Sequence, residues 1–401
     1  MKNYIYSLGG LIIFTASQLS WFVVLARFES PESVGTLAIS LALASPVFLT
    51  LGMNLRVVVA ITPVDEPAEY DYFLFQRAAG LVSTSICLAL GFLLSLTPTQ
   101  MSVLACICLA KFMEGQSSLA YGVLQRKGRF EQIFLSQSLR GIAGSAVFTS
   151  VIVVGAGLTI AVLAIAATYA VSYFFYDHQR PLVKKFRVGP YAASPFRLLR
   201  ESWLFGADQG VSSLAVNSPR FLLQVLSGST SVGLYSAVAA FGQAAALISG
   251  AYSMLFLTPL SNEFRTGQRN RMARTLILMM LLPVGLLVTL PIASIFFGDA
   301  IVAIVLGGDY VDNSLLTAIV GAFCAGGALR SLSKALEACR ALRVYTSVDT
   351  ITLVTTVGLG VVLVPRWGAT GAAVALGLGY GLALGTCLCA VLFILVRMGR
   401  S

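Results

Sequence analysis

The stretch SPRFLLQVLSGSTSVGLYSAV, residues 218–238, joins the end of one apolar segment to the start of another through a turn of small polar residues. An earlier stretch, SWFVVLARFESPESVGTLAIS, residues 20–40, has the same plan. When the Val-Gly pair at 34–35 is laid on the pair at 232–233, the offset is 198 residues (233 − 35), close to half of the 401 residues. The pattern predicts two copies of one half, each opening with a helix, a polar turn and a second helix.

The composition is that of a membrane protein. Hydrophobic residues make up 57% of the chain and charged residues 11%, whereas a soluble domain has roughly 25% charged residues. The first apolar segment lacks a small-residue cleavage site, so we expect a retained helix rather than a removed signal peptide. The seven cysteines form no CxxC motif and the chain has one histidine, so the sequence predicts neither a metal centre nor another cofactor.

Apolar segments of about 20 residues, the length needed to cross a bilayer, recur along the whole chain. They predict an all-α polytopic membrane protein with about twelve transmembrane helices. The predicted spans cover residues 8–27, 34–57, 76–96, 101–121, 133–154, 157–176, 202–226, 232–258, 274–297, 312–334, 343–364 and 369–396. An even number of spans places both termini on one side of the membrane.

The basic residues indicate which side that is. With the N-terminus inside, the cytoplasmic segments hold most of the arginines and lysines, for example those within 126–129, 180–187 and 265–274. The opposite side holds Arg366 beside several acids. This asymmetry predicts cytoplasmic termini. The net charge of +10 is then explained by an anionic membrane leaflet, and no nucleic-acid partner is expected.

The longest predicted non-spanning stretch is basic and rich in proline. It predicts a cytoplasmic linker over residues 177–201, between an N-terminal six-helix lobe (1–176) and a C-terminal six-helix lobe (202–401). Because six is an even number, both lobes enter the membrane in the same orientation. Two parallel repeats of this kind are related by a pseudo-twofold axis along the membrane normal.

Three segments of the chain resemble the polysaccharide exporters and O-antigen flippases. The first is Leu25-Ala26-Arg27-Phe28-x-x-Pro31-Glu32-x-x-Gly35. The second is Pro219-Arg220-x-x-Leu223 followed by Val232-Gly233-Leu234-Tyr235-Ser236. The third is LVPRWGATGAA, residues 363–373. These exporters form a family of the multidrug/oligosaccharidyl-lipid/polysaccharide (MOP) superfamily, and the resemblance extends over essentially the whole chain.

The resemblance implies a MATE-like fold of two six-helix bundles around a central cavity. It also implies a bacterial inner-membrane flippase that moves an undecaprenyl-pyrophosphate-linked oligosaccharide between leaflets by alternating access, for O-antigen or exopolysaccharide assembly. Membrane lipids and the enzymes that polymerise or ligate the polysaccharide are the implied partners. Basic side chains line the family's cavity, and Arg27, Arg56 and Arg220 match those positions.

Charged side chains inside spans cost roughly 2.5–3.5 kcal/mol each at the bilayer centre and therefore need an explanation. Lys111 and Glu114 stand three residues apart on one helix face, so they form either a structural pair or part of a cavity wall. Arg27 and Arg56 lie near span ends, where snorkelling to the interface is the alternative to substrate binding.

Arg220 is the strongest candidate for a substrate contact. It follows Asn217-Ser218-Pro219, where a proline is expected to break the helix beside an amide and a cation. Broken helices at depth hold ligands in secondary transporters. The polar side chains of Gln18, Asn217 and Gln224 are expected to face sugar hydroxyls.

Three acids in the spans are candidates for binding a coupling ion: Glu114, Asp208 and Asp349. A buried carboxylate holds its proton more strongly than one in water, as a proton-coupled cycle requires. The sequence alone does not distinguish an ion carrier from an ion-pair partner.

Two other functions are consistent with a polytopic chain. A cation-coupled drug exporter of the same superfamily favours an acidic, aromatic cavity, whereas the charges in these spans are mainly basic. An integral-membrane ligase or polymerase is expected to carry a long periplasmic loop, and the longest outward loop here, about 297–310, is short. We therefore expect a transporter rather than an enzyme.

Overall fold

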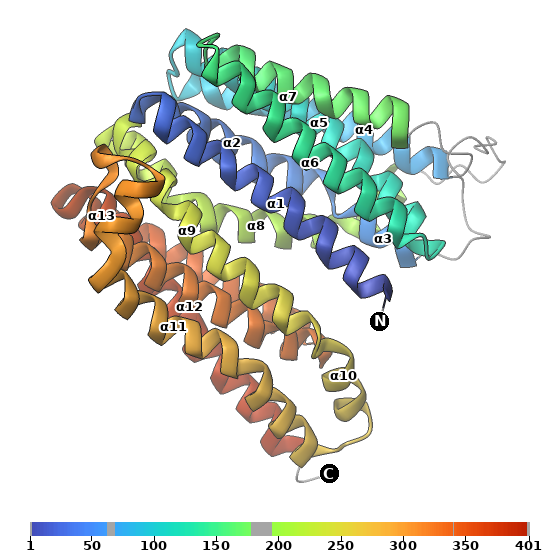
Figure 1. Cartoon of the computed structure of the whole chain (residues 1–401). Coiled ribbons are helices and arrows are strands. Elements are labelled where there is room, and N and C mark those ends of the chain that lie inside the picture. Colours follow the sequence, from blue (N-terminus) through green and yellow to red (C-terminus); the bar gives the residue numbers. More distant parts are fainter. Residues whose placement is uncertain (1, 62–68, 178–194, 340, 399–401) are drawn as a thin grey trace. The chain divides into compact units, whose positions relative to one another are not determined.

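The computed structural model describes residues 2–61, 69–177, 195–339 and 341–398, and Figure 1 shows that helices make up the regular structure of this part of the chain. No strand occurs within these ranges, so the all-α prediction is confirmed. The chain divides into two compact units, Met1–Ser213 and Leu214–Ser401, which we call unit 1 and unit 2.

Unit 1 contains the first seven helices, a π-helical turn and the beginning of an eighth helix. In chain order these are α1 (Lys2–Phe28), α2 (Pro31–Gly52), α3 (Leu55–Ile61), α4 (Glu69–Leu93), α5 (Pro98–Arg126), α6 (Phe130–Val153), α7 (Leu158–Ser172), η1 (Tyr173–Asp177) and the first part of α8 (Pro195–Ser227). Helix α1 packs on α6, whereas α5 contacts α2, α3, α4 and α7 and so forms the centre of the unit.

Unit 2 contains the end of α8 and the rest of the chain. Its elements are α9 (Ser229–Met254), α10 (Leu257–Arg265), α11 (Arg269–Val305), η2 (Gly308–Tyr310), α12 (Asn313–Ala338) and α13 (Leu342–Met398). Helix α12 is central here, since it packs against α9, α11 and α13.

Nine helical segments among the described residues are long and apolar enough to cross a membrane. Helices α6 and α8 are long but carry more polar side chains. Helix α13 has the length of two spans and a kink at Gly368, where φ is 55° and ψ is −130°. An ideal Cβ on Gly379 would lie 3.0 Å from the carbonyl oxygen of Thr352, so α13 folds back on itself. The twelve predicted spans therefore all fall on helices, and ten of them lie in segments that are long and apolar enough to cross a membrane.

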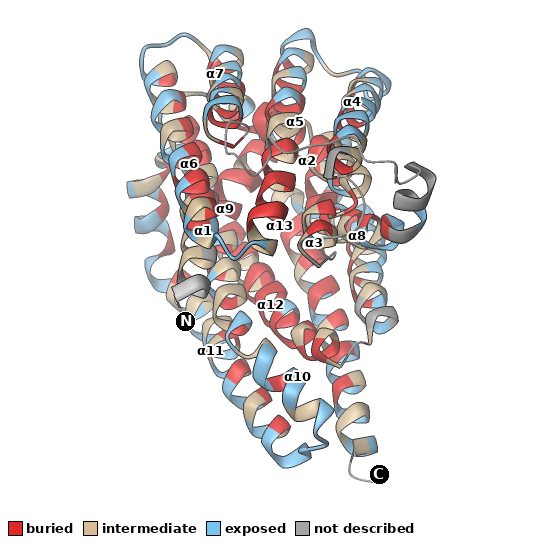
Figure 2. Ribbon diagram, turned by 90° about the vertical axis from the view of Figure 1, so that its right-hand side faces the viewer, coloured by how far each residue is buried: buried red, intermediate tan, exposed pale blue. Residues whose placement is uncertain are grey.

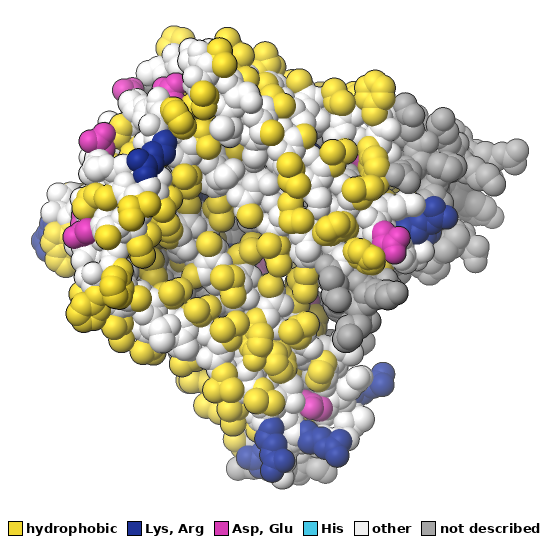
Figure 3. Space-filling model, viewed as in Figure 1, with side chains coloured by type: hydrophobic (Ala, Val, Ile, Leu, Met, Phe, Trp, Pro, Cys, Tyr) yellow, Lys and Arg dark blue, Asp and Glu magenta, His cyan; other side chains and the backbone are white. Residues whose placement is uncertain are grey.

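Burial is distributed as expected for helices surrounded by lipid. Helix α12 is mostly buried and α11 mostly exposed, and Figure 2 shows the buried residues gathered along the inward faces of the helices. The exposed side chains of α11 are apolar, among them Ile277, Leu281 and Phe296. Hydrophobic side chains also cover much of the face in Figure 3. Large exposed apolar surfaces of this kind mark contact with a membrane, which agrees with a multi-pass membrane protein.

Local signals in the sequence set several helix starts. Ser30 caps α2 by accepting a hydrogen bond from the backbone N–H of Ser33, and Pro31 follows it at the first helical position. Thr97 and Gln100 form a reciprocal capping box at the start of α5. Asp312 caps α12 in the same manner as Ser30.

The span predicted over residues 34–57 coincides with the apolar segment Pro31–Ala60, and the helix is interrupted near the C-terminal end of that segment. Helix α2 stops at Gly52, and α3 begins at Leu55 after two residues in the left-handed region, Met53 and Asn54, each with φ of 48°. Asparagine tolerates this conformation better than most residues, whereas methionine does not. The apolar run continues through the break, so hydrophobicity alone does not reveal it.

The predicted helix break at Pro219 is wrong, because α8 continues through the proline to Ser227. Proline lacks the N–H that would bond to the carbonyl four residues earlier, which belongs to Ala215. The Ser218 hydroxyl donates a hydrogen bond of 2.9 Å to that carbonyl oxygen instead. A neighbouring hydroxyl thus replaces the missing donor, as in other membrane helices that contain proline.

Of the predicted linker over 177–201, residues 178–194 lie outside the described residues. Along the chain, unit 1 ends and unit 2 begins within α8, after Ser213. The lobe boundaries at residues 176 and 202, and the twofold relation between the lobes, stay predictions.

Candidate functional site

A pocket of about 160 Å³, lined by apolar, polar and charged residues, lies within unit 1, between the α2–α3 break, α4 and α5. It brings together three of the charged residues singled out from the sequence: Arg56, Lys111 and Glu114. Among the described residues, its lining consists of Ser45, Phe48, Leu49, Gly52, Asn54, Leu55, Arg56, Gln76, Lys111, Glu114, Gly115, Ser118 and Leu119.

The α2–α3 break forms one wall of the pocket. Because the chain turns at Met53 and Asn54, the side chain of Asn54 lines the pocket and Arg56 falls in the first turn of α3. Left-handed conformations of non-glycine residues are unfavourable and cluster at functional sites. The position of this break beside three charged residues is therefore a structural reason to regard the pocket as a binding site.

Lys111 and Glu114 form an ion pair in the opposite wall. The Lys111 Nζ lies 2.9 Å from a Glu114 carboxylate oxygen, and the two side chains are 20% and 28% exposed. The sequence left open whether they pair or line a cavity, and in the structure they do both. Because the pair is internally neutral, Arg56 provides the net charge among the described residues of the pocket lining.

Arg56 is held against an aromatic ring. Its guanidinium carbon lies 5.6 Å from the centre of the Tyr121 ring, within the range of a cation–π interaction. Tyr121 continues a stripe on α5 formed by Lys111, Glu114 and Ser118, which are spaced three or four residues apart and therefore share one helix face.

Gln76 reaches the pocket from α4 because two glycines make room for it. An ideal Cβ on Gly115 would lie 2.8 Å from the Gln76 side-chain nitrogen, and one on Gly52 would lie 3.7 Å away. The amide therefore occupies space that larger residues would fill. Its donor and acceptor atoms are suited to a polar ligand.

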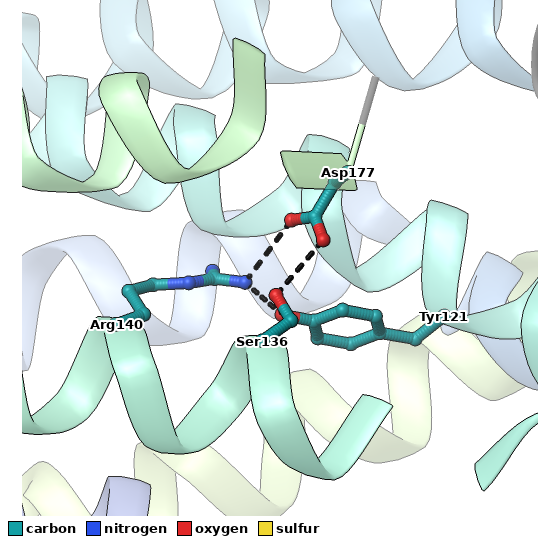
Figure 4. Close-up of polar contacts among 4 residues, drawn as sticks. All are labelled: Tyr121, Ser136, Arg140 and Asp177. Carbon is teal, nitrogen blue, oxygen red and sulfur yellow. Dashed lines mark hydrogen bonds and ion pairs between the residues drawn. The ribbon is translucent and has the colours of Figure 1, made fainter. Parts of the chain in front are cut away.

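Behind Tyr121 lies a buried network, drawn in Figure 4. The Arg140 guanidinium donates a hydrogen bond to the Tyr121 hydroxyl, which lies 2.7 Å from the Ser136 hydroxyl. Ser136 in turn donates to an Asp177 carboxylate oxygen at 2.8 Å. Arg140 and Asp177 also form an ion pair at 3.6 Å, with side chains only 2% and 0% exposed. The network ties α5 and α6 to η1.

Arg220 lies in unit 2, on α8, and is buried. It donates hydrogen bonds to the side-chain oxygen of Asn217 at 2.5 Å and to the Ser236 hydroxyl at 3.0 Å. Tyr235 and Tyr380 are within electrostatic range of its guanidinium. Its hydrogen-bond acceptors are therefore neutral groups rather than carboxylates.

The remaining predicted binding residues lie elsewhere. Arg27 is exposed in the last turn of α1. Gln18, on the same helix, is half-buried and approaches Tyr169. Gln224, in unit 2, accepts a long hydrogen bond of 3.4 Å from the Ser229 hydroxyl. None of these three belongs to the pocket lining, and their predicted contacts with substrate stay predictions.

The three acids proposed for ion coupling have different surroundings. Glu114 lines the pocket and pairs with Lys111. Asp208 is half-buried on α8. Asp349, on α13, lies within electrostatic range of Tyr380, as does Arg330. Their role in ion coupling stays a prediction.

The sequence alone did not identify Tyr121, Ser136, Asn54 or Gln76 as site residues. Asp177 was predicted to begin the linker, but in the structure it ends η1 and is buried. The spacing of Lys111, Glu114, Ser118 and Tyr121 was the available signal for Tyr121. No local pattern marks the others, because their partners lie on different helices.

Comparison with known proteins gives one family and one fold. The family model described as "Polysaccharide biosynthesis protein" matches residues 1–265. The capsular polysaccharide biosynthesis protein CapF of Staphylococcus aureus is 20% identical over 324 residues, which cover 80% of this chain and 81% of CapF.

Two solved structures illustrate the fold. The lipid II flippase MurJ in an inward closed conformation superposes with a TM-score of 0.75 at 13% identity, covering 98% of this chain and 89% of MurJ. An inward-facing multidrug resistance MATE family transporter of the MOP superfamily gives a TM-score of 0.73 at 12% identity, covering 97% and 96% of the two chains. These similarities confirm the expected MOP-type fold.

Proposed function

We propose, from the premise that this chain belongs to the polysaccharide biosynthesis protein family, that it is a flippase for a lipid-linked oligosaccharide and that the unit 1 pocket binds the pyrophosphate of that lipid. The chain spans a membrane many times and has the fold of MOP transporters. We place it in the bacterial inner membrane, with both termini in the cytoplasm and an undecaprenyl-pyrophosphate-linked substrate.

The observation that carries the proposal is the charge of the pocket. Among the described lining residues, Arg56 and Lys111 stand with a single carboxylate, that of Glu114, which Lys111 already neutralises. The described lining therefore has a positive excess, which favours an anion. Arginine presents a planar fork of N–H groups that matches phosphate oxygens, and lysine adds a point charge.

The size of the pocket supports a headgroup site. At about 160 Å³ it is smaller than the ~300–1,000 Å³ of pockets that enclose a whole drug-sized ligand. It can therefore hold a phosphate group while the sugars and the isoprenoid chain lie outside it. The hydroxyls of Ser45 and Ser118 and the amides of Asn54 and Gln76 complete a lining suited to polar oxygen atoms.

Surface polysaccharide provides the test, measured in cells that lack the chromosomal gene and normalised to the amount of membrane-inserted protein. A charge-assisted hydrogen bond contributes roughly 1.5–3 kcal/mol, about a tenfold to hundredfold change in affinity. We expect Arg56→Ala to lower the normalised signal by that factor, and Lys111→Ala to lower it less. Arg56→Lys should retain part of the activity because the charge is kept.

The matched control is Arg77→Ala, which removes an exposed arginine from α4, next to Gln76 but outside the pocket lining. It should leave the signal unchanged. Wild-type surface polysaccharide at normal abundance in the double variant Arg56→Ala Lys111→Ala would refute the pocket as the pyrophosphate site.

A further inference from the structure

The backbone of Arg56 rests directly on α5. An ideal Cβ placed on Gly122 would lie 2.6 Å from the Arg56 carbonyl oxygen and 3.1 Å from its Cα. Glycine at 122 is therefore what allows the first turn of α3 to approach α5 so closely. Any larger residue would push the backbone of Arg56 away.

The neighbouring residue, Tyr121, contacts the guanidinium group of the same arginine. Its ring centre lies 5.6 Å from the Arg56 guanidinium carbon and 5.5 Å from that of Arg140. Two cations thus share one ring. Because Asp177 pairs with Arg140, the second cation is neutralised and Arg56 is not repelled by a free charge on the other guanidinium.

The ring itself is fixed in place. Its hydroxyl is bonded to Arg140 and lies 2.7 Å from the Ser136 hydroxyl, and Ser136 is held by Asp177. The backbone of α3 is fixed as well, because Leu55 and Val59 are each only 2% exposed in a cluster with Leu119 and Val123 of α5. The backbone and the guanidinium of Arg56 are therefore both held in position before a ligand binds.

From these contacts we infer that Tyr121 and Gly122 are positioning residues, which hold Arg56 in the orientation in which it receives an anionic ligand. This inference rests on the proposed anion-binding function of the pocket. Neither residue belongs to the pocket lining, so their effect on binding passes through Arg56.

The physical gain is preorganisation. An arginine that must be ordered when the ligand binds gives a complex roughly threefold to tenfold weaker than one that is ordered beforehand. This loss of affinity is smaller than the loss expected when Arg56 itself is removed, which makes the two roles distinguishable by magnitude.

The experiment measures the affinity of purified full-length protein, reconstituted in nanodiscs of zwitterionic lipid, for farnesyl diphosphate as a soluble isoprenoid diphosphate. We expect Tyr121→Leu and Gly122→Ala each to weaken binding about threefold to tenfold. Tyr121→Phe, which keeps the ring, should stay within about twofold of wild type. In an Arg56→Ala background, neither Tyr121→Leu nor Gly122→Ala should weaken binding further, because the residue they position is absent.

Two matched controls separate positioning from general damage. Tyr169→Leu removes another ring facing Arg140, at 5.3 Å, but not facing Arg56. Gly144→Ala adds a methyl group on α6 at an ordinary contact distance of 3.4 Å from Tyr169. Both should leave the affinity for farnesyl diphosphate within about twofold of wild type, even where they lower thermal stability.

The outcomes distinguish a failure of the anion-binding pocket from a failure of the positioning role. If Arg56→Ala binds farnesyl diphosphate as well as wild type, the proposed pocket fails. If Arg56→Ala weakens binding but the Tyr121→Leu and Gly122→Ala effects are absent, or multiply with that of Arg56→Ala, the positioning role alone is overturned. Should Tyr121→Leu not fold, the Gly122→Ala cycle decides the question by itself.

Discussion

The Arg220 guanidinium donates a hydrogen bond of 2.5 Å to the side-chain oxygen of Asn217, one turn earlier on the same helix. A second hydrogen bond, of 3.0 Å, joins it to Ser236 on α9. Burying a cation is expensive unless a charge compensates it. Here the two acceptors are neutral groups, so they orient the guanidinium without balancing its charge.

Arg220 substitutions test the predicted role of this charge in substrate binding. If the charge contacts the lipid pyrophosphate, Arg220→Lys should retain part of the surface polysaccharide, whereas Arg220→Ala and Arg220→Glu should reduce it about tenfold to hundredfold at normal protein abundance. Ser236→Ala, which removes one neutral acceptor, is the control and should have a smaller effect. Full activity of Arg220→Ala at normal abundance would contradict the role.

The Arg140–Asp177 pair should behave as a structural element. Removing one partner of a buried pair typically costs about 3–5 kcal/mol, because the other charge is left uncompensated. We therefore expect Asp177→Ala to lower the amount of folded protein in the membrane strongly. Replacing both residues, in Arg140→Met Asp177→Leu, should recover much of that loss. The measurement is the thermal stability of detergent-solubilised protein, and a single variant as stable as wild type would exclude this role.

Cys339, at the C-terminal cap of α12, should react slowly with alkylating reagents at neutral pH. Burial raises the pKa of the Cys339 thiol to about 11, above the ordinary value of about 8.5. Because only the thiolate reacts, the alkylation rate of a variant that keeps this cysteine alone should rise about tenfold per pH unit between pH 8 and pH 10. The same protein unfolded in detergent should instead level off above pH 9. A plateau in the folded protein would show that the thiol is not shifted.

Cysteine labelling at positions 30 and 268 tests the predicted membrane orientation. Ser30 is exposed between α1 and α2, and Gln268 is exposed beside the arginines at 265, 269, 271 and 274. With cytoplasmic termini, a cysteine at position 30 should react with an impermeant thiol reagent in intact cells. A cysteine at position 268 should react only after permeabilisation. The reverse labelling would invert the predicted topology.

The sequence was sufficient to predict the spans because their signal is local. The predicted spans at 101–121 and 312–334 correspond to α5 (Pro98–Arg126) and α12 (Asn313–Ala338). Each is a long apolar run ended by glycine, proline or charged residues, and crossing a bilayer requires little more. The length and polarity of the segments were therefore enough to predict where most of the helices lie.

The site was only partly predictable from the sequence. Arg56, Lys111 and Glu114 could be identified because charges are conspicuous in apolar segments. Tyr121 and Asp177 could not, because they are 56 residues apart in sequence (177 − 121) and meet through Ser136. Asp177 also precedes a basic, proline-rich run and therefore resembles a linker residue. Such contacts depend on how helices pack, which a single sequence does not reveal.

The hydrogen bond from Ser218 to the carbonyl of Ala215 has a consequence for how this chain can evolve. The hydroxyl at 218 is required because Pro219 has removed the donor that this carbonyl would otherwise meet. Among relatives, the two positions should therefore change as a pair. A lineage that loses the proline is released from keeping the serine, whereas one that keeps the proline can exchange the serine only for another short side chain with a hydroxyl, such as threonine.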